Sequence, residues 1–186
     1  HSFPSRRSSD LETKTETFTV KAADGTTHDV VVVITGVNDA AVIGGDAAGA
    51  VTEDAATPNL TDSGILTLSD ADTGEAVFLS DTADISAATG TLGSLSITSA
   101  GVWTYSVANA DVQYLKAGQT KSETFTVKAS DGTTHNVVVV ITGVNDAAVI
   151  GGDDRGAVTE DDLVAPATRL TDSGTLTLSD ARSEER

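Results

Sequence analysis

Apolar and polar residues alternate with a period of two over several stretches of the chain, which is the pattern of a half-buried β-strand. In ETFTVKA (123–129), the phenylalanine, valine and alanine are separated by polar residues. In GVWTYSV (101–107), Trp103 falls on the same side as the next two alternate residues, tyrosine and valine. Shorter runs of this type occupy 65–69 and 92–98. We therefore expect these stretches to be strands, with Trp103 in the core.

The remaining pattern predicts an all-β fold. HNVVVVITG (135–143) is almost continuously β-branched, which is typical of a central strand covered on both faces. Turn signals at Gly90, Gly101, Gly118 and Asp131-Gly132 separate the runs. No stretch sustains the 3.6-residue apolar period of a helix. About seven short strands in roughly 100 residues predict an antiparallel β-sandwich of the immunoglobulin type.

The chain also repeats itself with a period of 107 residues. Residues 13–54 match 120–161 at 37 of 42 positions, and the five differences fall at 15, 23, 29, 47 and 48. A period this long suits a string of small domains better than a solenoid. We interpret 12–45 as the end of one repeat, 46–152 as a complete repeat, and 153–181 as the start of a third.

Both ends of the chain break the repeat. Residues 1–11 (HSFPSRRSSDL) and 182–186 (RSEER) resemble translated sequencing adapter rather than the repeat sequence expected there. We expect both to be artefacts and the first, 1–11, to be disordered, and we set them aside from functional reasoning. Met is absent, so we interpret the remainder as an internal piece of a longer protein.

Composition narrows the classes of partner. The formal net charge is −17, which disfavours nucleic acid and anionic membrane surfaces and is compatible with cation binding. Cys is absent, so disulfides and thiolate metal sites are excluded. No apolar run is long enough to cross a bilayer, and we expect no membrane insertion.

The carboxylates gather in the segments expected to form the two ends of the sandwich. Acidic residues lie beside Asn38 in the linker after the first repeat (Asp39), in SDADTGE after a strand (Asp70, Asp72, Glu75), in a turn (Asp131), and at the end of the first strand (Glu53, Asp54). Ca²⁺ prefers six to eight oxygen ligands of this kind. We predict Ca²⁺ at the junction between repeats; the alternative is a solvated acidic surface.

Four motifs carry a resemblance to a known family. These are VTED (51–54), SDADTGE (69–75), ASDG (129–132) and GVNDAA, which occurs at 36–41 and again at 143–148. Together with the rest of 46–152, they resemble the VCBS repeat, a cadherin-like domain of large bacterial surface and RTX-type adhesins. The resemblance implies a cadherin-like sandwich in an extracellular or cell-surface protein.

The resemblance also implies Ca²⁺ between successive domains. The first junction would use Asn38, Asp39, Asp70, Asp72 and Asp131, and the second would use Glu53, Asn145, Asp146 and Asp180. Some family ligands are missing, since Gly36 and Ala40 stand at two linker positions. The family's Asp-Arg-Glu motif is absent, with Asn109 and Asp111 as possible substitutes. We therefore expect fewer or weaker ions than in cadherins.

Three classes of function remain open at this point. The first is a Ca²⁺-stiffened structural spacer in an adhesin, whose partners are neighbouring repeats and, through other domains, a cell-surface or matrix ligand. The second is a carbohydrate- or protein-binding module, for which one Trp and two Tyr offer little. The third is an enzyme. Ser130, Asp131 and His135 lie on one short turn and rarely converge into a triad from there, so we expect no catalysis.

Overall fold

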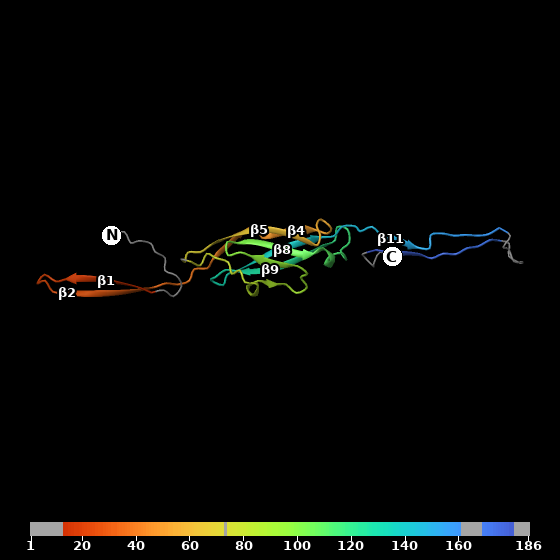
Figure 1. The fold of residues 1–186 in the computed structure, drawn as a ribbon. Helices are drawn as coiled ribbons and strands as arrows, with labels where there is room; N and C mark the ends of the chain where they lie inside the picture. The colour runs from red at the N-terminus through yellow and green to blue at the C-terminus, as the bar shows by residue number, and fades with distance from the viewer. Residues whose placement is uncertain (1–12, 73, 161–168, 181–186) are drawn as a thin grey trace.

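The computed structural model describes residues 13–72, 74–160 and 169–180. The adapter-like segments 1–11 and 182–186 lie outside the described residues. The described chain is almost entirely β-structure, with twelve strands and two short 3₁₀ turns, Thr82–Asp84 and Asn109–Asp111. Figure 1 shows a central sandwich with one hairpin projecting from each end. The all-β prediction is confirmed.

Two four-stranded sheets form the sandwich. The first contains, in order, β3 (Val42–Gly45), β5 (Asn59–Ser69), β8 (Val102–Ala108) and β7 (Ser94–Ile97). The second contains β4 (Ala48–Thr52), β10 (Thr134–Thr142), β9 (Thr120–Lys128) and β6 (Ser86–Ala87). Every pair is antiparallel except β4 and β10, which run parallel. The chain changes sheets between β3 and β4, and this crossing brings its first strands beside its last.

The alternating residues supply the core between the two sheets. Trp103 is fully buried, as predicted, and its Nε1–H donates to the backbone carbonyl of Asp46 at 2.7 Å. The tyrosine of the same strand, Tyr105, meets Phe125 edge to face with ring centroids 5.8 Å apart. The prediction that 135–143 is covered on both faces is wrong. The strand is central in its sheet, but Val138 is 37% exposed because no layer covers the outer face.

A buried carboxylate crosses the core beside these rings. Glu123 of β9 is 1% exposed. Its Oε1 accepts the Leu92 N–H at 2.6 Å, and its Oε2 accepts the Gly93 N–H at 3.0 Å and the Tyr105 hydroxyl at 2.8 Å. A buried charge is tolerated when hydrogen bonds satisfy it in this way. Glu123 therefore holds the loop before β7 against β9.

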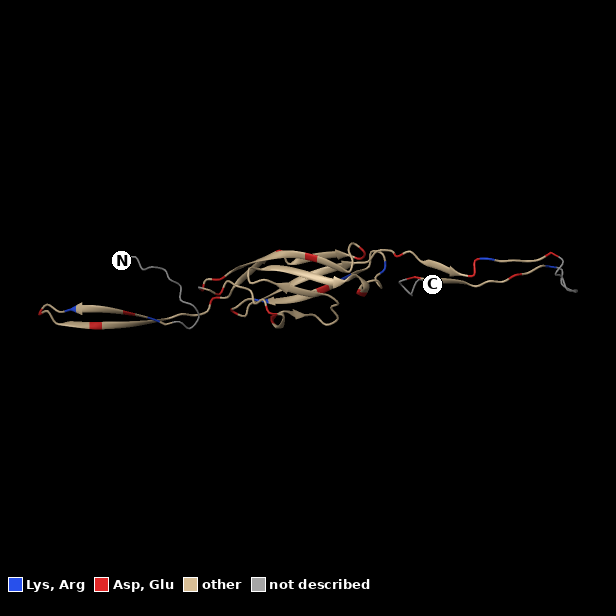
Figure 2. Cartoon of the chain, in the orientation of Figure 1, with Lys and Arg blue, Asp and Glu red and all other residues tan. Residues whose placement is uncertain are grey.

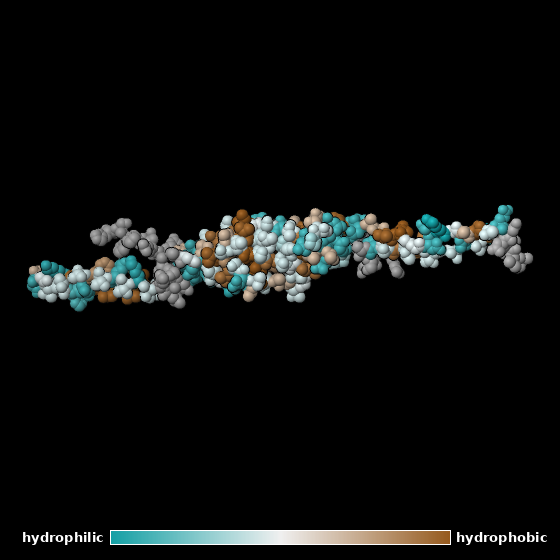
Figure 3. Space-filling view, in the orientation of Figure 1, coloured by the Kyte–Doolittle hydropathy of each residue, from teal (hydrophilic) through white to brown (hydrophobic). Residues whose placement is uncertain are grey.

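The two end hairpins repeat parts of the sandwich. β1 (Thr13–Lys21) and β2 (Thr27–Thr35) pair in the register of β9 and β10, with Phe18 opposite Val30. β11 (Val149–Gly152) pairs with β12 (Leu176–Ser179) as β3 pairs with β5. Figure 3 shows hydrophobic residues at the surface of both hairpins.

The sandwich begins before residue 46, because β3 lies in its first sheet. β11 is the counterpart of β3 and pairs within the C-terminal hairpin instead. The division of the chain into repeats at 46 and 152 stays a prediction. Among the described residues there is no helix with the length and apolar character needed to cross a membrane.

Candidate metal centres at the two ends of the sandwich

Acidic residues occur at both ends of the sandwich (Figure 2). At the first end, the chain turns directly after β5. The Asp72 N–H donates to Asp70 Oδ1 at 2.8 Å, which folds the loop back on itself. This turn brings carboxylate oxygens of Asp70, Asp72 and Glu75 within 4.8 Å of one another. The predicted pair Asp70 and Asp72 therefore lies together, and Glu75 joins it.

One oxygen of this cluster has the environment of a cation ligand. Asp70 Oδ2 is buried and accepts no hydrogen bond from the described protein. Leaving a buried carboxylate oxygen unsatisfied is costly, and a bound cation would remove that cost. Three convergent carboxylates suit Ca²⁺, which takes monodentate or bidentate carboxylates in flexible geometry. The residues present therefore fit the ion that the sequence implies.

The same end holds the linker that precedes β3. Asp72 Oδ2 accepts the Asp39 N–H at 2.8 Å, and Asp131 Oδ2 accepts the Ala41 N–H at 2.9 Å. Asp131 comes from the turn between β9 and β10, so carboxylates from two separate loops hold one linker. Asn38 and Asp39 lie in this linker with exposed side chains. The structure thus gathers the five residues of the predicted first junction around one short segment.

Hydrogen bonds set the charge state of Asp131. Burial alone would raise the pKa of Asp131. The hydrogen bonds from Ala41 and Thr133 outweigh that effect and lower its pKa below the ordinary value. The carboxylate is therefore ionised over a wide range of pH while it holds the linker.

At the opposite end, Glu53 holds the linker that follows β10. Glu53 is 1% exposed, and its Oε2 accepts the Val144 N–H at 2.8 Å. The Glu53 N–H donates to the Thr142 carbonyl at 2.9 Å. Asn145 and Asp146 come next in this linker, and Asn145 Nδ2 donates to the Asp146 carbonyl. The predicted ligand Glu53 therefore contacts the predicted linker directly.

Asp54 lies beside Glu53 and is held by two amides. Its Oδ1 accepts Asn109 Nδ2 at 2.7 Å and Gln113 Nε2 at 2.9 Å, and its N–H donates to Asn109 Oδ1 at 2.9 Å. The hydrogen bonds from Asn109 and Gln113 lower the pKa of Asp54, and the Asp146 side chain contributes further. Asn109, named as a possible substitute ligand, thus sits at this end; the other, Asp111, is exposed on the same 3₁₀ turn.

Asp180 follows β12 as Asp70 follows β5. Ser179 is opposite Val149 in the hairpin, just as Ser69 is opposite Val42. This register puts Asp180 next to the second linker. The membership of Asp180 in the second ligand set, with Glu53, Asn145 and Asp146, stays a prediction.

Sequence reasoning left two acidic residues out of its ligand sets. Glu75 belongs to the same acidic run as Asp70 and Asp72, and the spacing Asp-x-Asp-x-x-Glu was the signal for it. Asp54 stands next to Glu53 in the VTED motif, and the resemblance assigned only the glutamate as a ligand. Its backbone has φ 61°, which turns the chain and lets its carboxylate face Asn109.

The conceivable catalytic triad is not arranged as one. The Ser130 hydroxyl donates to the Glu75 carbonyl. The Asp131 carboxylate accepts from Ala41 and Thr133. His135 lies on β10, opposite Val127 of β9. The three side chains therefore have separate structural surroundings.

Comparison with known proteins identifies one family. The sequence profile described as "bacterial cadherin-like domain" matches residues 38–143. No curated protein matches the chain. A solved structure described as "Ca2+-stabilized adhesin helps an Antarctic bacterium reach out and bind ice" is 18% identical with a TM-score of 0.30. The match covers 81% of this chain but 36% of that one. A TM-score this low gives no ground for transferring that protein's properties.

Proposed function

The chain belongs to the bacterial cadherin-like domain family, and from this premise we propose that it is a non-catalytic tandem repeat whose joints are stiffened by Ca²⁺. We place it as a spacer in a large bacterial secreted or surface adhesin. Its immediate partners are the neighbouring repeats of the same protein. The narrower assignment to the VCBS repeat of RTX-type adhesins is part of this proposal.

The observation that supports the proposal is that one carboxylate at the predicted first junction belongs to the acidic cluster and also holds the linker. Asp72 belongs to the cluster that suits a cation, and the same carboxylate accepts the Asp39 N–H of the linker. A Ca²⁺ ion held by Asp70, Asp72 and Glu75 would offset two of three negative charges that otherwise repel one another. It would also fix the loop that holds the linker, and the binding free energy would offset the entropy lost when the joint is ordered.

The competing function of a carbohydrate-binding module has less support. Such sites usually present aromatic rings around a cleft. Trp103 and Tyr105 are fully buried in the core, whereas Tyr114 is 53% exposed. A single exposed tyrosine makes a poor platform for a sugar.

The proposal is tested by melting the chain in Ca²⁺ and in chelator. At a hundredfold excess of Ca²⁺ over the dissociation constant, linkage contributes about 2.7 kcal/mol. For a domain of this size that corresponds to a rise in Tm of the order of 10 °C. Replacing Asp70 and Asp72 with Asn should remove most of the rise. Mg²⁺ should give a smaller rise, because it demands a stricter octahedral geometry.

A charge-matched control separates ion binding from a change in net charge. Asp29→Asn combined with Asp81→Asn removes two exposed carboxylates away from the cluster, and Asn already stands at the position equivalent to Asp29 in the next repeat. This control should keep the full Ca²⁺ response. An identical Tm in Ca²⁺ and in chelator for the unchanged chain would mean that the acidic loops are only solvated surface.

A further inference from the structure

Strand β5 begins with a sequence motif that the proposed function does not use. Asn59, Leu60 and Thr61 spell Asn-x-Thr, and the middle residue is not proline. This is the acceptor motif for N-glycosylation, in which a sugar is attached to the asparagine amide. The motif occurs once in the chain. Because so short a motif also arises by chance, the surroundings of the asparagine have to show whether a transferase can reach it.

The strand turns the acceptor toward solvent. Side chains alternate between the two faces of a strand, so Leu60, 2% exposed, points into the core while Asn59 and Thr61 are exposed on the outer face. Asn59 is the first residue of β5, and it pairs with Ala108, the last residue of β8. The acceptor thus lies where two strands end together, and strand ends open at the lowest cost in free energy.

The side-chain amide of Asn59 has no structural task of its own. Within the part of the chain that the structure describes, it makes no hydrogen bond. The side chains of Asn109, Asn136 and Asn145, in contrast, are each hydrogen-bonded to a neighbouring residue. Attaching a sugar to Asn59 would therefore break no contact of the folded sandwich.

The surface beside Asn59 is uncharged and rich in hydroxyl groups. The residue opposite Asn59 is Ala108, whose methyl group leaves room for a sugar ring. The neighbouring outward-facing residues of β5, β8 and β7 all carry hydroxyls: Thr61, Ser63, Thr104, Ser106, Ser94 and Ser96. Hydroxyl groups both donate and accept hydrogen bonds, so this face suits the hydroxyls of a neutral sugar.

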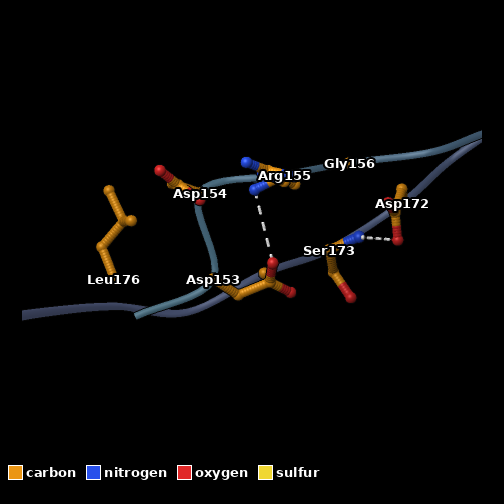
Figure 4. A pocket seen from close by; sticks show the side chains of 8 residues that line it. Asp153, Asp154, Arg155, Gly156, Asp172, Ser173 and Leu176 are labelled. Carbon is orange, nitrogen blue, oxygen red and sulfur yellow. Dashed lines mark hydrogen bonds between the residues drawn. The ribbon is translucent and has the colours of Figure 1, made fainter. Parts of the chain in front are cut away.

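The next repeat keeps this segment without its acceptor. NLTDSG at 59–64 corresponds to RLTDSG at 169–174, so arginine stands where the complete repeat has its asparagine. The aspartate of each segment accepts the N–H of the serine that follows it, at 2.8 Å in both. Figure 4 shows this contact between Asp172 and Ser173, at the edge of a hollow whose counterpart in the complete repeat is filled by β8. The same local structure therefore forms with either residue in first place.

We propose that Asn59 is an acceptor for N-glycosylation. Its Nδ2 attacks the anomeric carbon of a sugar carried on the diphosphate of a nucleoside or of a lipid. A C–N bond forms as the C–O bond to the diphosphate breaks, the amide gives one proton to a base of the transferase, and the diphosphate leaves with the bonding electrons. The partner is a glycosyltransferase that recognises Asn-x-Thr, and the attached sugar covers the hydroxyl-rich face beside the acceptor.

The test measures sugar transfer to the folded, unmodified full chain by intact-mass spectrometry. One arm supplies a soluble transferase specific for Asn-x-Ser/Thr with UDP-glucose, and the other supplies a membrane oligosaccharyltransferase with a glycan on a lipid diphosphate. A peptide of sequence AATPNLTDSGI (55–65) is the unfolded reference acceptor in both arms. The chain should gain one sugar, mapped to Asn59, at an initial rate within about tenfold of that of the peptide, because strand ends open readily.

Matched variants separate the motif from its surroundings. Asn59→Arg copies the next repeat and should take no sugar. Thr61→Ala should take none either, whereas Thr61→Ser should be modified, because the motif requires a hydroxyl at this position. Thr67→Ala removes an exposed threonine of the same strand outside the motif and should be modified like the unchanged chain. Thermal melts report the folding of each variant, and these exposed substitutions should shift Tm by less than about 4 °C.

A folded chain that takes no sugar in either arm overturns the proposal, whether or not the peptide is modified. Modification of the peptide alone would mean that β5 hides the acceptor. A sugar that maps to another residue, or that is still attached in Asn59→Arg, overturns the proposal as well. Asn59 lies outside both predicted ligand sets for Ca²⁺, so failure here is distinguishable from failure of the calcium-stiffened joint.

Discussion

A glutamate stands at equivalent positions in β9 and in its copy β1, and its surroundings differ between the two. Glu123 is buried under three hydrogen bonds. Glu16 occupies the equivalent place in β1, but its side chain is 25% exposed and pairs with Lys14 at 2.7 Å. The sequence around both is nearly identical, so local sequence could not reveal which glutamate carries a structural role. The glutamate is buried only where the loop before β7 packs against it and donates its backbone N–H groups.

Replacing Glu123 with Ala should therefore be far more damaging than replacing Glu16. Removing the Glu123 carboxylate leaves two backbone N–H groups and the Tyr105 hydroxyl without partners, which should lower the free energy of unfolding by about 3 kcal/mol or more. Glu16→Ala loses one exposed ion pair and should change it by less than about 0.5 kcal/mol. Urea denaturation followed by Trp103 fluorescence measures both. Equal effects would contradict the role given to the buried carboxylate.

Acid should weaken the first joint through Asp131. Its pKa is lowered in the folded state, so its contribution to stability is present above the unfolded value of 3.8 and is lost as pH falls through the folded value. Asp131→Asn should be less stable near neutral pH and should show a shallower loss of stability below about pH 4. Thermal melts between neutral and acidic pH, in chelator, make the comparison. If stability falls equally steeply with pH in the variant, Asp131 does not contribute to the acid sensitivity of the fold.

At the scale of elements, the sequence predicted which segments form strands. It did not predict which strands lie next to each other in a sheet. Alternation identified β8 and β9 because one face of each is buried. The β-branched run of β10 suggested two covered faces, since valine is favoured by strand geometry as well as by burial. The crossing of the chain between β3 and β4 had no local signal. It depends on pairing with β10, which lies about 90 residues away.

The hairpin β1–β2 shows what happens to strands without those neighbours. Phe18 is 48% exposed, whereas its counterpart Phe125 is 1% exposed. Val30 is 44% exposed, whereas its counterpart Val137 is fully buried. An apolar strand pair with open edges is a template for association with other chains.

We therefore expect a shorter chain of residues 38–147 to be more soluble and more resistant to protease than the full chain. It keeps the sandwich and both linkers and omits the two exposed hairpins. Light scattering and limited proteolysis at matched concentration measure the difference. Protease should trim the full chain to a product of about this length, because exposed, weakly packed segments are cleaved first. Equal scattering and equal rates of cleavage would show that the hairpins are protected in solution.

At the scale of the molecule, the repeat was the most informative feature of the sequence. It predicted that the acidic strings belong to joints, and the structure places both copies of GVNDAA at the ends of the sandwich. The gathering of acidic residues at the first end could be foreseen in large part because they lie in three short loops. The second end was harder to foresee, because there the amides of Asn109 and Gln113 hold Asp54, and no acidic motif marks those two residues.

The parallel pairing of β4 with β10 has a mechanical consequence. The two linkers leave the sandwich at opposite ends (Figure 1), so tension along the chain pulls β4 and β10 in opposite directions along their length. The five residue pairs from Ala48–Val138 to Thr52–Thr142 are then loaded in shear and must give way together rather than unzip one at a time. Forced unfolding is governed by the rate of crossing that barrier. Single-molecule stretching should show a high rupture force for the sandwich, and Val140→Pro, which removes one backbone donor from this ladder, should lower it.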